Sequence, residues 1–128
     1  MMLLDTCVLL WLAADTTAIS TRVAELIRST PEGLFVSAIS AYEVGQKAAA
    51  GKLSLTKPVD AWFTAMMQWH GLQEIPVSGV IAARATLLPA IHGDRFDRLL
   101  IATAQEHRFK LLTPDVTIAK YPNLDIIW

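Results

Sequence analysis

The stretch HGDRFDRLLIATAQEHRF, His92–Phe109, decides the fold because it joins a strongly apolar helix to two aspartates at its start. Its apolar residues recur with the helical period and cover much of the helix, so we expect this helix in the protein interior. Asp94 stands at the N-cap position, and Asp97 follows one turn later beside the apolar stripe. Two interpretations of Asp94 stay open: a cap that binds the amide of Asp97 while Asp97 reaches back, or a functional carboxylate.

Length and composition limit the possible functions. A chain of 128 residues fits one domain, which we expect to span residues 1–128. Its 53% hydrophobic content is high for a small monomer, so we expect an oligomer or an obligate partner. The formal net charge of −1 predicts that any nucleic acid is held by local basic residues or through metal ions. The single Cys7 excludes an internal disulfide and zinc sites built on paired cysteines, which suits a reducing cytoplasm.

Strand-like and helical patterns alternate along the chain. Residues 1–14 lack a basic leader and carry Asp5 within their apolar run, so we expect a strand and a helix rather than a signal peptide. No apolar run approaches the roughly 20 residues of a membrane span. We expect strands at residues 2–4, 34–39, 73–77, 110–113 and 124–128. The alternation predicts a doubly wound α/β domain, with a mostly parallel sheet of about five strands and helices on both faces.

Four acidic residues should meet at one edge of this sheet. Asp5, Glu43 and Asp115 each follow a predicted strand within a few residues, and Asp97 opens the helix that leads into the fourth strand. Ligands of such sheets bind at the carboxyl ends of the strands. Each acid alone could be a helix cap, and Glu43 could complete a capping box with Ser40. Caps do not explain why the four acids cluster.

Clustered carboxylates require a cation. Two unpaired carboxylates about 4 Å apart repel by roughly 4 kcal/mol at an effective dielectric constant of about 20. Basic residues are scarce at the strand ends apart from Arg95 and Arg98, which flank Asp97 on other faces of its helix. Oxygen ligands without paired Cys or His favour Mg²⁺ or Mn²⁺ over zinc. The acids therefore predict a metal site suited to phosphodiester hydrolysis.

Two threonines stand next to these acids. Thr6 follows Asp5 directly, and Thr113 lies two residues before Asp115. Their hydroxyls could orient the acidic ligands or bind a phosphate oxygen. The alternative is that both are ordinary turn residues at strand ends.

The sequence also predicts where the three histidines and two large apolar residues lie. His70, His92 and His107 show no metal-ligand spacing, and we expect His107 in the core and the other two at the surface. Met67 and Trp69 fall off the apolar stripe of their helix, which suggests a partner surface, with core packing as the alternative.

The sequence resembles the PIN-domain family, and within it the VapC-like toxins of type II toxin–antitoxin pairs. The matching segments are LLDT around Asp5, VSAISAYEVGQKAAAGKLSL around Glu43, DRFDRLLIATA around Asp97, LLTPD ending in Asp115, and the terminal IIW. They span essentially the whole chain in the order of the family. The acidic quartet of the family falls on these four residues, and Asp94 matches an extra acid of this subgroup. Arg95 departs from the subgroup, where proline is common.

This resemblance implies a Mg²⁺- or Mn²⁺-dependent endoribonuclease with Asp5, Glu43, Asp97 and Asp115 as catalytic and metal-binding residues and Asp94 as an auxiliary ligand. It also implies a cytoplasmic homodimer that has no membrane association. A co-expressed antitoxin would bind near residues 43–69 and inhibit it, with a basic side chain inserted among the acids. The RNA that is cleaved varies too widely in the family to be inferred.

Two other functions of doubly wound domains require residues that this chain lacks. An aspartate-nucleophile phosphatase needs a second acid where Cys7 stands, and a phosphoacceptor receiver needs an aspartate where Val77, Ser78 and Gly79 follow the third strand. Both are excluded by these residues. The remaining alternative is a catalytically idle α/β module that binds RNA or protein and keeps the acids only as caps.

Overall fold

A five-stranded, wholly parallel sheet runs through the centre of the computed structural model, which describes residues 1–128. The chain moves outward from β1 through β2 to β3, then crosses back to the other side of β1, giving the order β3-β2-β1-β4-β5. This confirms the predicted doubly wound α/β fold. The strands are β1 (Met2–Leu4), β2 (Leu34–Ser37), β3 (Gln73–Ile75), β4 (Lys110–Leu112) and β5 (Ile126–Ile127).

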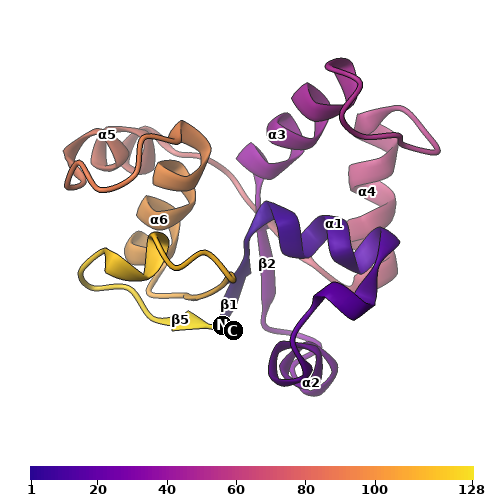
Figure 1. Cartoon of the computed structure of the whole chain (residues 1–128), viewed down its shortest axis with the longest axis horizontal. Helices are drawn as coiled ribbons and strands as arrows, with labels where there is room; N and C mark the ends of the chain where they lie inside the picture. The colour runs from indigo at the N-terminus through magenta and orange to yellow at the C-terminus, as the bar shows by residue number, and fades with distance from the viewer.

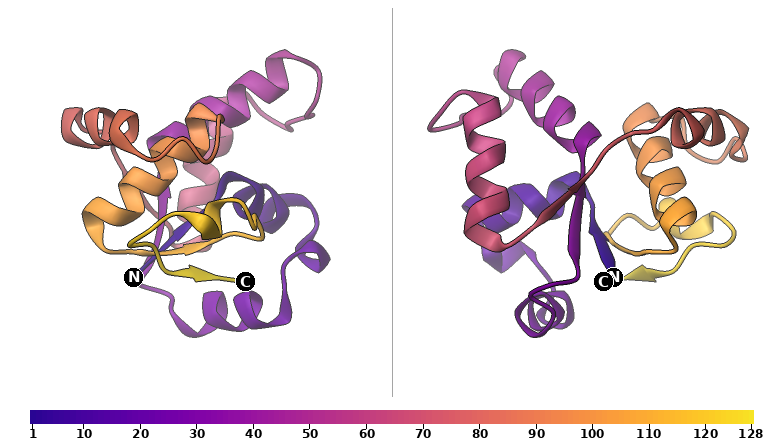
Figure 2. Two further views of the ribbon diagram at one scale, coloured as in Figure 1. Left: turned by 60° about the vertical axis from the view of Figure 1, so that its left-hand side comes forward. Right: turned by 180° about the vertical axis from the view of Figure 1, so that it is seen from behind.

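Helices cover both faces of the sheet. Helices α1 to α4 lie on one side of β1 and β2, and α5 and α6 lie on the other (Figures 1 and 2). None of the helices combines the length and the apolar character needed to cross a membrane. The helices are α1 (Thr6–Ala14), α2 (Thr21–Ser29), α3 (Ala38–Ala49), α4 (Val59–His70), α5 (Gly79–Leu87) and α6 (Arg95–His107), with 3₁₀ turns η1 (Thr16–Ala18) and η2 (Ile118–Lys120).

Alternate residues of the strands contribute to two separate cores. Leu4 and Val36 pack into the cluster formed with α1, α2 and α4, whereas Leu3, Phe35 and Leu111 pack against α6. Successive side chains of a strand point to opposite faces of a sheet. Because both faces are buried at the centre of the sheet, β1 and the Leu34–Val36 part of β2 are continuous apolar runs, whereas the edge strand β3 exposes Gln73 and Glu74.

Serine hydroxyls set where several elements begin. Ser20 caps α2 and Ser78 caps α5, since each hydroxyl accepts a backbone amide at 3.2 Å. The second strand ends at Ser37, two residues earlier than expected, because Ser37 caps α3 by accepting the amide of Ile39 at 3.1 Å. The early turn into α3 brings the first turns of this helix to the carboxyl edge of the sheet.

Two histidines lie in environments that differ from the prediction. His107, expected in the core, is exposed, because it is the last residue of α6, which Arg108 caps with a φ of +56°; its ring stacks on Phe109 at 5.1 Å. His70, expected at the surface, is half-buried, and burial lowers its pKa. The helical stripe correctly indicated the buried part of α6 but not its last turn.

Candidate active site

The acidic cluster lies where the strand order reverses, between β1 and β4. Asp5 follows β1 and Thr113 follows β4, and the Thr113 hydroxyl donates to Asp5 Oδ2 at 2.6 Å. This hydrogen bond joins the carboxyl ends of the two central strands. In sheets of this kind, ligands bind at this point of reversal.

Asp5 is held as a buried carboxylate and is not a helix cap. It occupies the N-cap position of α1, yet its side chain makes no capping hydrogen bond. Its residue is only 7% exposed, and burial raises its pKa, with hydrogen bonds from Thr113, Thr6 and Cys7 acting in the opposite direction. The capping alternative for Asp5 is therefore wrong, and its carboxylate faces the cluster.

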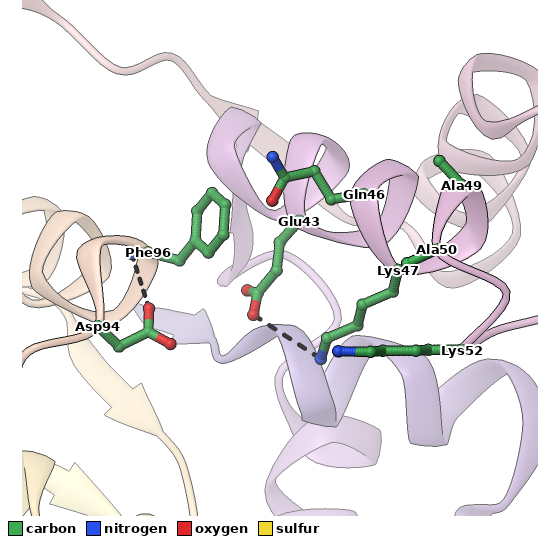
Figure 3. A pocket seen from close by; sticks show the side chains of 8 residues that line it. All are labelled: Glu43, Gln46, Lys47, Ala49, Ala50, Lys52, Asp94 and Phe96. Carbon is green, nitrogen blue, oxygen red and sulfur yellow. Dashed lines mark hydrogen bonds and ion pairs between the residues drawn. The ribbon is translucent and has the colours of Figure 1, made fainter.

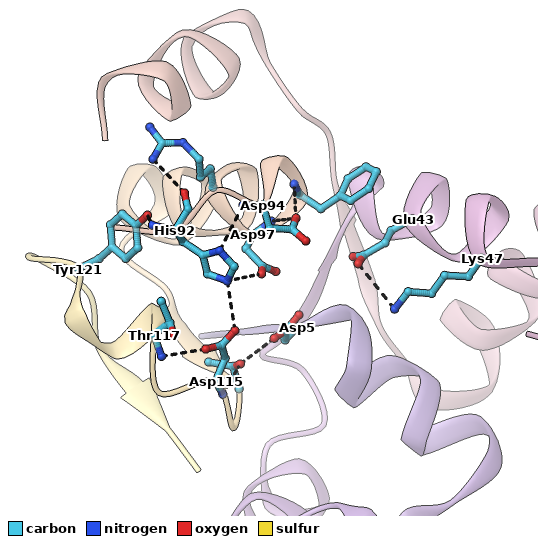
Figure 4. A network of polar contacts seen from close by, with 12 residues as sticks. Asp5, Glu43, Lys47, His92, Asp94, Asp97, Asp115, Thr117 and Tyr121 are labelled. Carbon is cyan, nitrogen blue, oxygen red and sulfur yellow. Dashed lines mark hydrogen bonds and ion pairs between the residues drawn. The ribbon is translucent and has the colours of Figure 1, made fainter. Parts of the chain in front are cut away.

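The two aspartates of α6 have different partners. Asp94 is the N-cap and accepts the amides of Phe96 and Asp97 at 2.8 and 3.2 Å, as the capping interpretation predicted. Asp97 does not reach back, and its carboxylate points toward Asp5 and Asp115 (Figure 4). Burial raises the pKa of Asp97 to about 7, with further contributions from the negative charges of Asp5, Asp94 and Glu43.

His92 belongs to the cluster, so its expected surface position is wrong. Its Nε2 lies 3.0 Å from Asp97 Oδ2 and 3.4 Å from Asp115 Oδ2 (Figure 4). Its Nδ1 accepts the amide of Asp94 at 3.2 Å, which leaves the ring proton on Nε2. His92 therefore donates toward both carboxylates and bridges them.

The loop that carries His92 is fixed by residues distant in sequence. The His92 amide donates to the Tyr121 hydroxyl at 2.7 Å. The Arg98 guanidinium donates to the carbonyls of Ala85, Leu88 and Pro89 at 2.9 Å each and to that of His92 at 3.4 Å. The one local signal for His92 was its place two residues before the N-cap, and that signal alone did not distinguish it from a surface histidine.

Asp115 orders a turn with one carboxylate oxygen and faces the cluster with the other. Its Oδ1 accepts the amide of Thr117 at 2.8 Å and so orders the turn before η2, but it does not cap that helix, whose N-cap is Thr117. Its Oδ2 faces His92, and its own amide donates to the Thr113 hydroxyl at 3.1 Å. Thr113 thus contacts both Asp5 and Asp115.

Glu43 lies in the second turn of α3, too far along the helix to be a cap. The predicted capping box with Ser40 is wrong, because α3 is capped by Ser37, and the Ser40 hydroxyl instead pairs with that of Thr6 at 2.9 Å. Glu43 Oε2 lies 3.7 Å from Lys47 Nζ, whereas Oε1 is buried with no hydrogen-bond partner. Thr6 accordingly links α1 to α3 and does not contact an acid through its hydroxyl.

The donor set fits a hard divalent cation. Carboxylates from four segments of the chain face one edge of the sheet, and Lys47 forms an ion pair with Glu43 at 3.7 Å. A buried carboxylate oxygen without a partner, such as Oε1 of Glu43, costs free energy unless a cation or donor satisfies it. Carboxylate oxygens are the ligands that Mg²⁺ and Mn²⁺ prefer. One ring nitrogen of His92 and one oxygen each of Asp97 and Asp115 lie within 4.8 Å of one another, with the His92 N–H donating to the two carboxylates.

A cavity of about 560 Å³ opens beside the cluster. Glu43 and Asp94 line its acidic end, Phe96 forms one wall, and Lys47 and Lys52 lie on the opposite side of Glu43 (Figure 3). The cavity therefore opens to two carboxylates of the cluster, those of Glu43 and Asp94.

The chain is similar to one family model, to a curated ribonuclease and to solved toxin–antitoxin structures. A model of the family described as PIN domain matches residues 2–124. Ribonuclease VapC22 of Mycobacterium tuberculosis (strain ATCC 25618 / H37Rv) is 32% identical over 129 residues, covering 98% of this chain and 97% of that protein. A toxin–antitoxin complex from Klebsiella pneumoniae matches with a TM-score of 0.67 at 21% identity, covering 100% of this chain and 97% of that one. VapBC2 from Rickettsia felis, bound to a DNA fragment from its promoter, matches with a TM-score of 0.73 at 16% identity. The match covers 98% of this chain and 96% of that one.

Proposed function

The chain belongs to the PIN-domain family, and from this premise we propose that it is a metal-dependent endoribonuclease that acts as the toxin of a toxin–antitoxin pair. The observation that carries the proposal is the gathering of Asp5, Glu43, Asp97 and Asp115 at the reversal point of the sheet, with a carboxylate oxygen of Glu43 buried and unpartnered. The 32% identity to a ribonuclease over almost the full chain supports the reaction class.

We assign the metal, Mg²⁺ or Mn²⁺, to these four acids, with Asp94 as an auxiliary ligand. When bound, the ion would stabilise negative charge on the phosphodiester and lower the pKa of the attacking water. The residues of the chain position these ligands: Thr113 holds Asp5, and His92 holds Asp97 and Asp115. Thr6 acts less directly, through its hydrogen bond to Ser40 on the Glu43 helix.

We propose further that the whole chain forms one domain, that it works as a homodimer in the cytoplasm, and that an antitoxin binds near residues 43–69. Two structural neighbours, the toxin–antitoxin complex from Klebsiella pneumoniae and VapBC2 from Rickettsia felis, support such a partner. Trp69 is 84% exposed on α4, beside a cavity of about 290 Å³ that also involves Leu12 and Trp62. Met67, expected with Trp69 at a partner surface, is half-buried and packs against the core.

Cleavage of a mixed RNA pool tests the proposal. The purified protein is incubated with Mg²⁺, with Mn²⁺ and with EDTA, and Asp5→Asn is assayed beside it as a control for contaminating nuclease. Glu74→Gln, an exposed acid outside the cluster, serves as the matched control. We expect cutting that needs a metal, is lost in Asp5→Asn and is retained in Glu74→Gln. Metal-independent cutting, or equal cutting by Asp5→Asn, would contradict the assignment.

The alternative of an idle binding module makes a different prediction. Such a module would bind RNA without cutting it and would show no calorimetric signal on titration with Mn²⁺. Heat of Mn²⁺ binding that is lost in Asp5→Asn would favour the nuclease even if the pool lacks its target.

A further inference from the structure

Glu43 and Lys47 form an ion pair within α3, and its burial differs from that of the other ion pair within a helix. In the pair of Arg28 and Glu25 in α2, both side chains are exposed, at 66% and 68%. In the α3 pair, the Glu43 side chain is only 13% exposed and that of Lys47 is 41% exposed. Exposed ion pairs contribute little to stability, whereas a buried carboxylate is costly unless a positive charge is near. Lys47 therefore compensates a buried charge of the acidic cluster.

The Lys47 ammonium also lies near the start of α1. Burial and the charge of Asp5 raise the pKa of the Cys7 thiol, and the charge of Lys47 acts in the opposite direction. Figure 4 shows Lys47 on the opposite side of Glu43 from His92. The cluster therefore has an ammonium group at one end and the His92 N–H donor at the other.

Three aspartates of the cluster are joined to one another by hydrogen bonds. The His92 N–H donates to Asp97 and Asp115 at 3.0 and 3.4 Å. The Thr113 hydroxyl donates to Asp5 at 2.6 Å and accepts the amide of Asp115 at 3.1 Å. These contacts hold the three aspartates as one group at the reversal point of the sheet.

Glu43 stands apart from this group. Its Oε2 faces Lys47 at 3.7 Å, and its Oε1 is buried with no hydrogen-bond partner. Oε1 is therefore the oxygen left for a metal ion, because Oε2 already has a positive partner. In sites with two metal ions, the ions lie about 3.5–4 Å apart, and carboxylates are shared between them. Glu43 would instead be shared between one ion and an ammonium group.

We propose that the Lys47 ammonium takes the place of a second divalent ion, so that the site binds one metal ion per chain. A second ion beside Glu43 would be repelled by this ammonium, and water would screen the repulsion little because Glu43 is mostly buried. Lys47 thus contributes the positive charge that a second ion contributes in two-metal nucleases. This inference rests on the proposed nuclease function and adds the number of ions and a positioning role for Lys47, which holds Oε2 of Glu43.

The number of Mn²⁺ ions bound per chain tests this inference. Calorimetry and electron paramagnetic resonance, which distinguishes free from bound Mn²⁺, measure this number at a pH above the pKa of Asp97. We expect one ion in the wild type and two in Lys47→Met, which keeps an unbranched side chain without the charge. Lys47→Arg restores the charge and should bind one ion again. Two Mn²⁺ ions in one site are magnetically coupled, so the spectrum of bound Mn²⁺ in Lys47→Met should also differ from that of the wild type.

Lys52→Met is the matched control. Lys52 lines the same cavity as Lys47 but takes part in none of the ion pairs of the protein, so its replacement should leave the number of ions at one. Thermal unfolding in EDTA checks that the variants fold, and Lys47→Gln replaces Lys47→Met if that variant shows no unfolding transition. Two ions in the wild type, or one ion in the folded uncharged variant, would overturn the inference.

The outcome is separable from that of the proposed function. RNA cleavage by a wild type that binds two ions would refute the role of Lys47 and leave the nuclease intact. One ion in the wild type and two in Lys47→Met, without RNA cleavage under any metal, would support the role of Lys47 and refute the nuclease. A wild type that binds no Mn²⁺ would refute both.

Discussion

We expect Asp97→Asn to stabilise the metal-free protein at neutral and alkaline pH. Burial and the charges of Asp5 and Asp94 raise the pKa of Asp97 from 3.8 to about 7. Each pKa unit is worth about 1.4 kcal/mol, so ionised Asp97 costs the folded state up to about 4 kcal/mol. The side chain is only 16% exposed, so solvent screens little of this cost. Asparagine is neutral and can still accept the hydrogen bond from His92.

The raised pKa of Asp97 also determines whether the free energy of unfolding rises or falls with pH. The folded state keeps the Asp97 proton up to about pH 7, whereas the unfolded state releases it near pH 4. The folded state therefore binds more protons between these values, and its free energy of unfolding falls as pH rises through this range. The advantage of Asp97→Asn should be small near pH 4 and should reach its full size above pH 7.

Urea unfolding in EDTA gives the free energy of unfolding of the wild type and of Asp97→Asn at about pH 5 and about pH 8. The fluorescence of the four tryptophans follows the transition. Asp125→Asn, an exposed acid at the opposite edge of the sheet, is the matched control and should change little at either pH. A gain for Asp97→Asn of the same size at both pH values, or no gain at about pH 8, would refute the electrostatic account of the cluster.

Three further outcomes are expected. In the wild type, Mn²⁺ affinity measured by calorimetry should rise about tenfold per pH unit up to about pH 7 and level off above it, because protonated Asp97 cannot bind the ion; a flat profile would contradict this. His92→Phe should weaken Mn²⁺ binding about 10- to 100-fold, with partial recovery in His92→Gln, which keeps an N–H donor; unchanged affinity would show that His92 does not position the ligands. Arg98→Leu should lower the free energy of unfolding by about 2–4 kcal/mol in urea titrations, since it leaves backbone carbonyls without their donor, whereas Arg95→Leu should have little effect.

Periodicity and strand ends predicted the features that depend on local sequence. The sheet, the buried stripe of α6, and the meeting of Asp5 and Asp97 at one edge follow from which residues are apolar and where each run ends. The end of the second strand was missed because Ala38 and Ile39 extend an apolar run that Ser37 interrupts by capping α3. Apolar residues alone do not distinguish the last residues of a strand from the first turn of a helix.

The parts of the cluster that escaped prediction depend on contacts between distant residues. His92 enters the site because Tyr121, 29 positions later, and the Arg98 guanidinium fix the path of its loop. No spacing rule around His92 encodes a partner at that distance. The pairing of Glu43 with Lys47 was a local feature, separated by one helical turn, and a search for oppositely charged residues four positions apart finds it.

The hydrogen bond between Thr113 and Asp5 has a consequence for how the protein comes to be active. It joins residues 108 positions apart, and it can form only after β1 and β4 have paired. Contacts of such long sequence separation form late, because the entropy of closing a long loop opposes them until much of the chain is ordered. Partly folded molecules, with helices formed but the central strands unpaired, therefore have separated carboxylates and no site. Nuclease activity and completion of folding should thus appear together in a refolding experiment.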